Sequence, residues 1–352
     1  MSRFLNAQYR SLNAYTPGEQ PRDTQYIKLN TNESPYPPAP SVVAAMTGEQ
    51  VELLRLYSDP TAKGLKEKLA GLYGVKTENV FVSNGSDEVL NFAFMAFGGR
   101  GAVFPDISYG FYQVYGDLYH IDYERIPLKE DFSIDIPEFK KANGTIFIAN
   151  PNAPTGLILS LDEIREILES NKDNIVVIDE AYIDFGGESC YRLINEYDNL
   201  LVVQTYSKSR SLAGARLGFG IGSPEIIADL QKIRNSNNPY NINRFTQALG
   251  AASILDTEYF GNCTGTIIEN REFLTQELEK RGFEVIPSKA NFIFAKHNAK
   301  DGKEIYTKLK NSGVLVRHFD KERISMYNRI TIGSMTEIEK LLEAIDNILE
   351  RN

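Results

Sequence analysis

One loop of the sequence combines a lysine, several hydroxyl groups and two arginines. It covers residues 204–218 and follows an apolar run, 200–203, whose length and β-branching are typical of a buried strand. Ligands of open α/β sheets bind at the carboxyl ends of such strands. Positive charge from Arg210 and Arg216 would disfavour protonation of Lys208 and leave a nucleophilic amine. A solvent-exposed loop rich in serine and arginine is the competing interpretation, and this loop alone favours neither.

A second strand end carries two carboxylates. The apolar run 175–178 is followed by Asp179 and Glu180, and Tyr182 comes shortly after them. Burying a carboxylate costs several kcal/mol unless a positive group partners it. The positive group is either a basic side chain in a structural salt bridge or the protonated ring nitrogen of a cofactor. The spacing of these residues is compatible with both.

Two further strand ends lead into turns that suit a ligand. Residues 83–88, Ser-Asn-Gly-Ser-Asp-Glu, join an apolar run to a helix, and free N–H groups at a helix start bind anions. Capping of that helix by Ser86 or Asp87 is the simpler interpretation and is favoured for this segment taken singly. Residues 149–156 form a turn fixed by two prolines. Polar groups at four strand ends of one sheet together indicate a ligand site.

These strand ends need a common sheet, which the sequence predicts. Short apolar runs alternate with amphipathic stretches from about residue 62 onward, which favours a mostly parallel sheet with helices on both faces. The predicted strands cover 79–82, 101–104, 145–149, 175–178, 200–203 and 217–221, and the predicted helices cover 63–73, 87–97 and 161–169.

The pattern changes after about residue 224 to long helices and then to a smaller α+β portion. The predicted helices cover 224–234, 246–256 and 267–281, the strands 283–286, 292–295, 314–316 and 329–332, and the last helix 336–349. The proline-rich residues 34–40 are predicted to be extended. We therefore expect an N-terminal arm with part of the small domain at 1–45, a large domain at 46–270 and a small C-terminal domain at 271–352.

The composition argues against several classes of protein. The chain has 352 residues, enough for more than one domain, and its net charge of −9 argues against a nucleic-acid-binding surface. The N-terminus lacks the apolar core of a signal peptide and no apolar stretch is long enough to span a bilayer, so we expect a cytoplasmic protein. Cys190 and Cys263 are expected to stay reduced, and His120, His297 and His318 lack metal-ligand spacing.

The order of the motifs resembles that of the fold type I aminotransferases, which depend on pyridoxal phosphate, and most of all the histidinol-phosphate branch of that family. The motifs are Asn-Gly-Ser-Asp-Glu, Asn-Pro-Asn-Ala-Pro-Thr-Gly, Asp-Glu-Ala-Tyr, Ser-Lys-x-x-x-Leu-Ala-Gly-x-Arg-x-Gly and Arg-Ile-Thr-Ile-Gly. The resemblance begins at Leu29–Glu33 and covers essentially the whole chain. It implies an α/β fold, with a large domain around a mostly parallel sheet and a smaller α+β domain.

The resemblance implies catalytic roles for three residues. Lys208 would hold the cofactor through a Schiff base and move a proton between the substrate's α-carbon and the cofactor. Asp179 would keep the pyridinium nitrogen protonated, and Tyr182 would bond the phenolic oxygen of the ring. The other expected cofactor contacts are Ser86, Asp87, Thr205, Ser207 and Arg216 around the phosphate, and Tyr109 stacked on the ring. Tyr57 would reach the phosphate in the neighbouring subunit, which implies a homodimer with shared active sites.

One position departs from the family pattern. Members commonly have a second asparagine before the Pro-Thr-Gly, and it bonds the phenolic oxygen of the cofactor, but here that position is Ala153. Either Asn152 substitutes for it through a rotated turn, or Tyr182 serves alone.

The resemblance also implies a substrate. Arg317 and Arg329, with Tyr15, would grip the phosphate of L-histidinol phosphate, and 2-oxoglutarate would accept the amino group in a ping-pong exchange. The reaction would give imidazole-acetol phosphate and glutamate in histidine biosynthesis. One of the two arginines could instead form an ordinary interdomain salt bridge. The alternatives are an aromatic amino-acid aminotransferase or threonine-phosphate decarboxylase with the same cofactor, and, more remotely, a non-catalytic regulator that binds pyridoxal phosphate.

Overall fold

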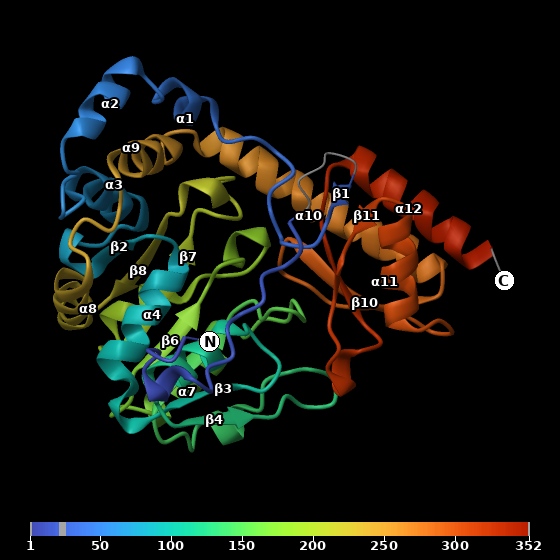
Figure 1. Cartoon of the computed structure of the whole chain (residues 1–352), viewed down its shortest axis with the longest axis horizontal. Coiled ribbons are helices and arrows are strands. Elements are labelled where there is room, and N and C mark those ends of the chain that lie inside the picture. The colour runs from blue at the N-terminus through green and yellow to red at the C-terminus, as the bar shows by residue number, and fades with distance from the viewer. Residues whose placement is uncertain (1, 21–25, 351–352) are drawn as a thin grey trace.

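The computed structural model describes residues 2–20 and 26–350 as a larger and a smaller lobe joined by a long helix, α10 (Thr257–Lys280) (Figure 1). The larger lobe is built on a seven-stranded sheet of order β2-β8-β7-β6-β5-β3-β4. β8 runs opposite to the other six strands, which share one direction, so the predicted mostly parallel sheet is confirmed. In sheet order the strands are Val80–Ser83, Gly218–Gly222, Leu200–Thr205, Val176–Asp179, Thr145–Ala149, Ala102–Pro105 and Tyr123–Ile126.

Helices cover both faces of this sheet because its central strands are apolar on both sides. In β5, Ile146 and Ile148 belong to one core, whereas Phe147 between them belongs to a second core on the opposite face. There Phe147 stacks on Phe94 of α4 with the ring centroids 4.0 Å apart. The helices of this lobe are α1 (Pro40–Ala44), α2 (Gly48–Glu52), α3 (Lys63–Tyr73), α4 (Ser86–Phe97), α5 (Phe111–Tyr119), α6 (Ile136–Phe139), α7 (Leu161–Ser170), α8 (Pro224–Asn237) and α9 (Arg244–Ser253).

The smaller lobe is an antiparallel sheet packed on helices. Its strand order is β12-β13-β10-β9, and a separate parallel pair joins β1 to β11. A third apolar core lies between these strands and the C-terminal helices. The elements are β1 (Ile27–Lys28), β9 (Phe283–Ile286), β10 (Phe292–His297), α11 (Gly302–Asn311), β11 (Val314–Leu315), β12 (Arg317–His318), β13 (Asn328–Thr331) and α12 (Met335–Glu350).

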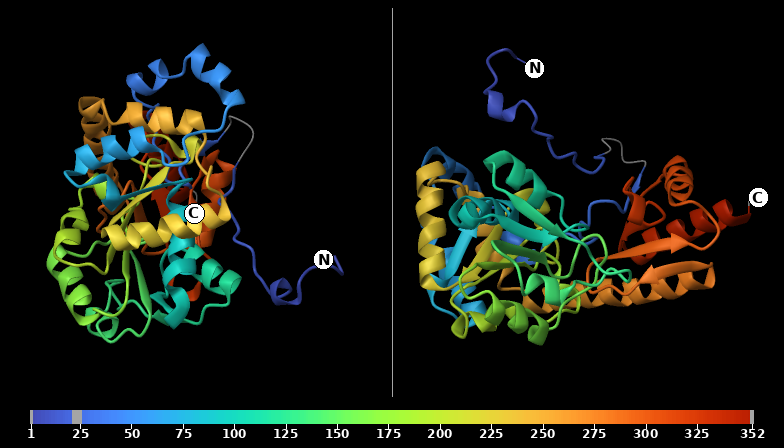
Figure 2. Two further views of the ribbon diagram at one scale, coloured as in Figure 1. Left: turned by 90° about the vertical axis from the view of Figure 1, so that its left-hand side faces the viewer. Right: turned by 90° about the horizontal axis from the view of Figure 1, so that it is seen from below.

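The N-terminal segment, residues 2–20, lies outside all three cores. Figure 2 shows its first residues extending away from the body of the molecule. The chain then enters the smaller lobe, because β1 pairs with β11. Residues 34–39 are not helical, as predicted, whereas Pro40 starts α1, where the fixed φ of proline suits a first helical position.

The structure differs from the sequence prediction at several elements. The edge strand β4 was missed because it carries Glu124 and Arg125, whose charges break the apolar pattern. The helix α5 and the two-residue strands β1 and β12 were also missed. The helix α10 begins at Thr257, ten residues before the predicted start at 267, and it continues through the expected domain boundary at 270. The three-part division of the chain therefore stays a prediction.

The cysteines and the helix lengths can also be compared with the sequence predictions. Cys190 and Cys263 are free and buried, as predicted. None of the helices within residues 2–20 and 26–350 is both long enough and apolar enough to cross a membrane.

Candidate active site

Two adjoining cavities open where the carboxyl ends of the parallel strands face the smaller lobe. The inner cavity, of about 390 Å³, lies against the large sheet. The outer cavity, of about 310 Å³, lies between that sheet edge and the smaller lobe. Both cavities are lined by Thr31, Tyr109, Ala153, Tyr182 and Lys208. The sequence-predicted residues Ser86, Asp87, Asp179, Thr205, Ser207 and Arg216 line the inner cavity, and Tyr15, Arg317 and Arg329 line the outer one.

Lys208 stands at the junction of the two cavities. The Lys208 ammonium donates a hydrogen bond to the carbonyl of Thr31 at 3.2 Å and lies 5.7 Å from the centroid of the Tyr182 ring. Arg216 also reaches the inner cavity, but Arg210 lines neither cavity. Instead Arg210 donates to the carbonyl of Ser253 and packs over aromatic rings, so it anchors the loop. The expected influence of Arg210 on the lysine is not supported by this arrangement.

Of the two carboxylates at the end of β6, only Asp179 faces the inner cavity. It is 5% exposed and accepts hydrogen bonds from the Tyr112 hydroxyl at 3.2 Å and the Ala181 N–H at 3.3 Å. No described cationic side chain lies within ion-pair distance of it. Burial, together with the negative charge of Asp87, raises the pKa of Asp179 to about 7. The salt-bridge interpretation therefore does not describe this carboxylate, which is placed to meet a protonated ligand nitrogen.

Glu180 points to the other side of the strand, as alternation along a β-strand requires. Its carboxylate accepts hydrogen bonds from Ser189, Gln204 and the N–H of Cys190. Burial raises the pKa of Glu180 to about 7 as well. This carboxylate is part of the internal packing and does not line the cavities.

The first turn of α4 forms one end of the inner cavity. Gly85 is the N-cap residue, with φ of +81°, and no side-chain hydrogen bond caps the helix. The expectation that Ser86 or Asp87 caps α4 is therefore wrong. Asp87 is engaged elsewhere, because it accepts hydrogen bonds from Tyr109 at 2.7 Å and from Arg216 at 3.1 Å. The N–H groups at the start of α4 are left for an anion.

Two glycines allow the backbone to close around this anion site. A Cβ on Gly218 would lie 2.2 Å from the backbone nitrogen of Ser86, and a Cβ on Gly85 would lie 2.7 Å from the Arg216 guanidinium. The Thr205 and Ser207 hydroxyls lie 3.0 Å apart on the same wall. Helix N–H groups, a guanidinium and hydroxyl groups thus converge on one end of the cavity, which suits a phosphate.

The turn at residues 150–156 does not direct the side-chain amide of Asn152 into either cavity. Asn152 is 2% exposed, and its side chain bonds Ser108, the carbonyl of Ile107, and Thr155. It lines neither cavity, whereas Ala153 lines both. The geometry therefore gives Asn152 a role in holding the turn and leaves Tyr182 as the hydroxyl donor in this region.

The outer cavity contains the two predicted arginines side by side. Arg317 of β12 and Arg329 of β13 are direct partners in the antiparallel sheet. Arg329 donates to the carbonyl of Asn30 at 2.9 Å, while its Nε is buried without a hydrogen-bond partner, and burial lowers its pKa. Neither arginine has a described carboxylate within 4.0 Å, so the interdomain salt bridge considered above is absent among residues 2–20 and 26–350.

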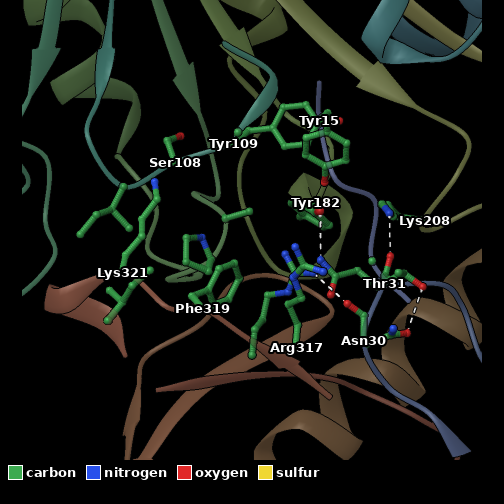
Figure 3. Close-up of a pocket in the computed structure, with 18 residues that line it drawn as sticks. Tyr15, Asn30, Thr31, Ser108, Tyr109, Tyr182, Lys208, Arg317, Phe319 and Lys321 are labelled. Atoms are coloured by element: carbon green, nitrogen blue, oxygen red, sulfur yellow. Dashed lines mark hydrogen bonds between the residues drawn. The ribbon is translucent and has the colours of Figure 1, made fainter. Parts of the chain in front are cut away.

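The N-terminal arm closes the outer cavity. Figure 3 shows the rings of Tyr15 and Tyr109 on one side, Arg317 on the opposite side, and Lys208 next to Thr31. Tyr15 packs on Phe111, with the ring centroids 4.3 Å apart. Residues not singled out from the sequence also line this space, namely Asn30, Thr31, Asn32, Ser108, Phe319 and Lys321. Asn30, Thr31 and Asn32 could have been found from the sequence, because they lie in the motif Leu29–Glu33, where the resemblance to the family begins.

Tyr57 lies away from both cavities of its own chain. Its side chain is 79% exposed and stacks on Tyr240, with the ring centroids 4.6 Å apart. It is not among the residues that line either cavity, and the role expected for it belongs to the site of a second subunit.

Comparison with known proteins identifies the family. The model of the class I and II aminotransferases matches residues 24–345. The chain belongs to this family. The histidinol-phosphate aminotransferase of Brachyspira hyodysenteriae is 50% identical over 99% of this aminotransferase and 100% of the relative. The enzyme of the same name from Clostridium botulinum strain Kyoto is 50% identical over the full length of both chains.

Solved structures agree with this assignment at the level of the fold. The histidinol-phosphate aminotransferase of Clostridium acetobutylicum superposes with a TM-score of 0.86 at 23% identity, covering 92% of this aminotransferase and 99% of that chain. The enzyme of Sinorhizobium meliloti, solved in complex with pyridoxal-5'-phosphate, gives a TM-score of 0.83 at 22% identity, covering 92% and 90%. The expected fold type I architecture is confirmed.

The inner cavity of this aminotransferase fits pyridoxal phosphate. Its uncapped helix start and Arg216 suit the phosphate, and the buried Asp179 suits a protonated ring nitrogen. Lys208 lies within the same cavity, where an amine would meet the aldehyde carbon. The helix start has no side-chain cap and Asp179 has no described cationic partner, whereas Arg216 pairs with Asp87 and still reaches the cavity.

Proposed function

We propose that this aminotransferase transfers the amino group of L-histidinol phosphate to 2-oxoglutarate, giving imidazole-acetol phosphate and glutamate, as a step in histidine biosynthesis. The observation that carries the proposal is the pair of arginines, Arg317 and Arg329, in the cavity next to Lys208, neither of them within ion-pair distance of a described carboxylate. Two adjacent guanidinium groups match a phosphate dianion. The relatives at 50% identity over the full chain, which bear the histidinol-phosphate name, give the same substrate.

Residues of the inner cavity hold the cofactor and move the proton. Pyridoxal phosphate supplies an aldehyde carbon that bonds amines and a ring that delocalises the electron pair left at the substrate's α-carbon. Lys208 would remove the proton from that α-carbon and deliver it to the former aldehyde carbon of the cofactor, so that the amino group stays with the cofactor. The Asp179 carboxylate, ionised when a cationic partner lies beside it, keeps the ring nitrogen protonated. The remaining contacts are those of Tyr182 with the ring oxygen, Tyr109 with the ring face, and Ser86, Asp87, Thr205, Ser207 and Arg216 with the phosphate.

Residues of the outer cavity select the substrate. Arg317, Arg329 and the Tyr15 hydroxyl bind the substrate phosphate, and this places the α-carbon next to Lys208. In the second half of the exchange Arg329 binds a carboxylate of 2-oxoglutarate. One cationic site thus serves both substrates in turn, as ping-pong kinetics requires.

The functional unit is a homodimer in which Tyr57 reaches the cofactor phosphate of the neighbouring subunit. Two features support this assembly: Tyr57 is largely exposed and lines neither cavity of its own chain, and apolar residues are exposed on the segment that carries it. These residues are Val43, Met46, Val51, Leu54 and Leu56. Several large apolar side chains exposed on one short segment favour a protein contact there. We place the enzyme in the cytoplasm, where amino acids are made.

Substrate exchange tests the function directly. The purified protein, loaded with pyridoxal phosphate, is mixed with L-histidinol phosphate, with histidinol, with phenylalanine or with threonine phosphate, and glutamate formed from 2-oxoglutarate is measured. The proposal expects L-histidinol phosphate to react fastest and histidinol, which lacks the phosphate, to react far more slowly. Faster turnover of phenylalanine would contradict it, and release of carbon dioxide from threonine phosphate would favour the decarboxylase.

A further inference from the structure

Three consecutive residues of the arm each contact one functional side chain. The carbonyl of Asn30 accepts from Arg329 at 2.9 Å, and the carbonyl of Thr31 accepts from Lys208 at 3.2 Å. The side-chain amide of Asn32 donates to the Tyr182 hydroxyl at 3.1 Å. The first two contacts use the backbone, which any residue supplies. The third depends on the identity of the side chain at position 32.

Asn32 is held rigidly by the smaller lobe. It is 1% exposed and has a φ of +58°, a conformation that asparagine tolerates better than most residues. Its N–H donates to the Thr331 hydroxyl at 3.0 Å, and its carbonyl accepts from the Asn291 amide at 3.0 Å. The side chain of Asn32 is therefore presented to Tyr182 from a fixed backbone.

The hydrogen bonds around Asn32 determine which way its amide points. The Thr331 oxygen already accepts from the backbone N–H, so its own proton is free for the Asn32 Oδ1, 3.1 Å away. The amide oxygen is therefore directed to Thr331 and the NH₂ group to Tyr182. The opposite orientation would place the NH₂ group against the hydroxyl of Thr331 and the oxygen against Tyr182.

This orientation controls the proton of Tyr182. Because the Tyr182 oxygen accepts from Asn32, its own O–H proton must point elsewhere. Among the described residues Tyr182 donates no hydrogen bond, and its side chain lines both cavities. The proton of the Tyr182 hydroxyl is thus available to a ligand oxygen in the cavity.

We propose that Asn32 is a positioning residue that directs the Tyr182 hydroxyl proton to the ring oxygen of the cofactor. This rests on the proposed function. The role matters in this chain because Ala153 provides no amide donor, and the amide of Asn152 donates to the carbonyl of Ile107 and to the Thr155 hydroxyl. The Tyr182 hydroxyl is then the hydrogen-bond donor to the ring oxygen, and Asn32 sets the direction of the hydroxyl proton.

The pH titration of the cofactor absorbance reads out this contact. Negative charge on the ring oxygen attracts the proton on the Lys208 nitrogen. A hydrogen-bond donor at the ring oxygen stabilises that charge and so weakens its hold on the proton. Weakening the donor therefore raises the pH at which that proton leaves, by about one pH unit for a charged hydrogen bond. The variants are Asn32→Gly, which tolerates the positive φ, and Asn32→Asp, which keeps the side-chain size but accepts the Tyr182 proton.

A double-mutant cycle with Tyr182→Phe separates positioning from a general structural effect. The inference expects both Asn32 variants to raise the pH midpoint, and expects Asn32→Gly to add no further shift in the Tyr182→Phe background. Asn171→Ala, which removes another buried amide that bonds only backbone carbonyls, serves as the matched control and should leave the midpoint unchanged.

The outcomes distinguish this inference from the proposed function. An unchanged midpoint in both Asn32 variants, or a further shift in the double variant, would overturn the role of Asn32. If wild-type protein forms no absorbance band with pyridoxal phosphate, the proposed function fails together with it. Cofactor dissociation constants, measured by adding pyridoxal phosphate to the cofactor-free protein, should rise in Asn32→Gly and in Tyr182→Phe by similar factors.

Discussion

Arg317 and Arg329 lie directly opposite each other on β12 and β13, and neither has a described carboxylate within 4.0 Å. Like charges at opposed positions of a sheet are unfavourable. The nearest contacts of the two guanidinium groups are neutral, namely the carbonyl of Asn30 and the rings of Phe292 and Phe319. The two guanidinium groups therefore favour binding of an anion between them.

Replacing either arginine by alanine should raise the KM for L-histidinol phosphate about 10- to 100-fold, because each removes charge-assisted hydrogen bonds. Steady-state kinetics measures the change. Histidinol, which lacks the phosphate, should be affected much less by Arg317→Ala. Thermal unfolding of the ligand-free protein should change little or improve, since one of two repelling charges is gone. Equal losses for both substrates would contradict a phosphate-binding role. Arg192→Ala, on an exposed arginine outside the cavities, is the control.

Lys208→Ala should abolish transamination and covalent attachment of the cofactor. The side-chain amine is the nucleophile that bonds the aldehyde carbon, and no other described lysine lines the inner cavity. Borohydride reduction followed by mass spectrometry should add the cofactor mass to wild-type protein at residue 208 and add none to the variant. Lys172→Ala is a matched control, and a stable adduct in Lys208→Ala would rule out this assignment.

Asp179 should make the ligand-free protein less stable as the pH rises. Its folded pKa of about 7 lies above the unfolded value, so the native state holds the extra proton between about pH 4 and pH 7. Stability from that group is lost as the pH rises through this window. Asp179→Asn removes this titration. The melting temperature of the variant, relative to that of wild type, should therefore rise from pH 5 to pH 8. Glu180 titrates in both proteins and cancels in the comparison. A pH-independent difference would count against the buried, unpaired carboxylate.

Tyr57 should act across the subunit interface. Tyr57→Ala is expected to weaken cofactor binding, since it removes one phosphate contact. Mixing it with Lys208→Ala should restore activity, because a mixed dimer contains one site with both wild-type residues. Activity assays after co-refolding measure this complementation. No recovery, in mixtures shown to exchange subunits, would mean that Tyr57 does not act across the interface.

Gly218→Ala should damage both the fold and the anion site. Its Cβ would lie 2.2 Å from the Ser86 nitrogen, so the start of α4 must shift, at a cost of about 2 kcal/mol or more. Chemical denaturation and the cofactor dissociation constant report the two effects. Gly265→Ala in α10 is the matched control, because nothing lies near its Cβ and alanine favours a helix. Normal cofactor affinity in Gly218→Ala would show that the close approach is unimportant.

Much of the fold could be predicted from the chain. Apolar runs such as 145–149 and 200–203 mark buried strands because both their faces are covered, and the alternation with helices implies parallel strands. The edge strand β4 was hidden because one side of an edge faces water and tolerates charge, as at Glu124 and Arg125. The two-residue strands β1 and β12 carry no periodic signal at all.

The sequence by itself determined the chemistry: a lysine, a carboxylate and an arginine at strand ends, in an order that resembles one family. Strand ends of a parallel sheet meet at one edge, so Lys208, Asp179 and Arg216 were bound to converge. Only the tertiary structure decided which neighbours act there. Glu180 and Arg210 bond internal groups away from the cavities, the Asn152 amide donates to the carbonyl of Ile107, and Asn32 of the arm lies against Tyr182. Side-chain direction and contacts between distant segments depend on packing of the two lobes, which no local pattern encodes.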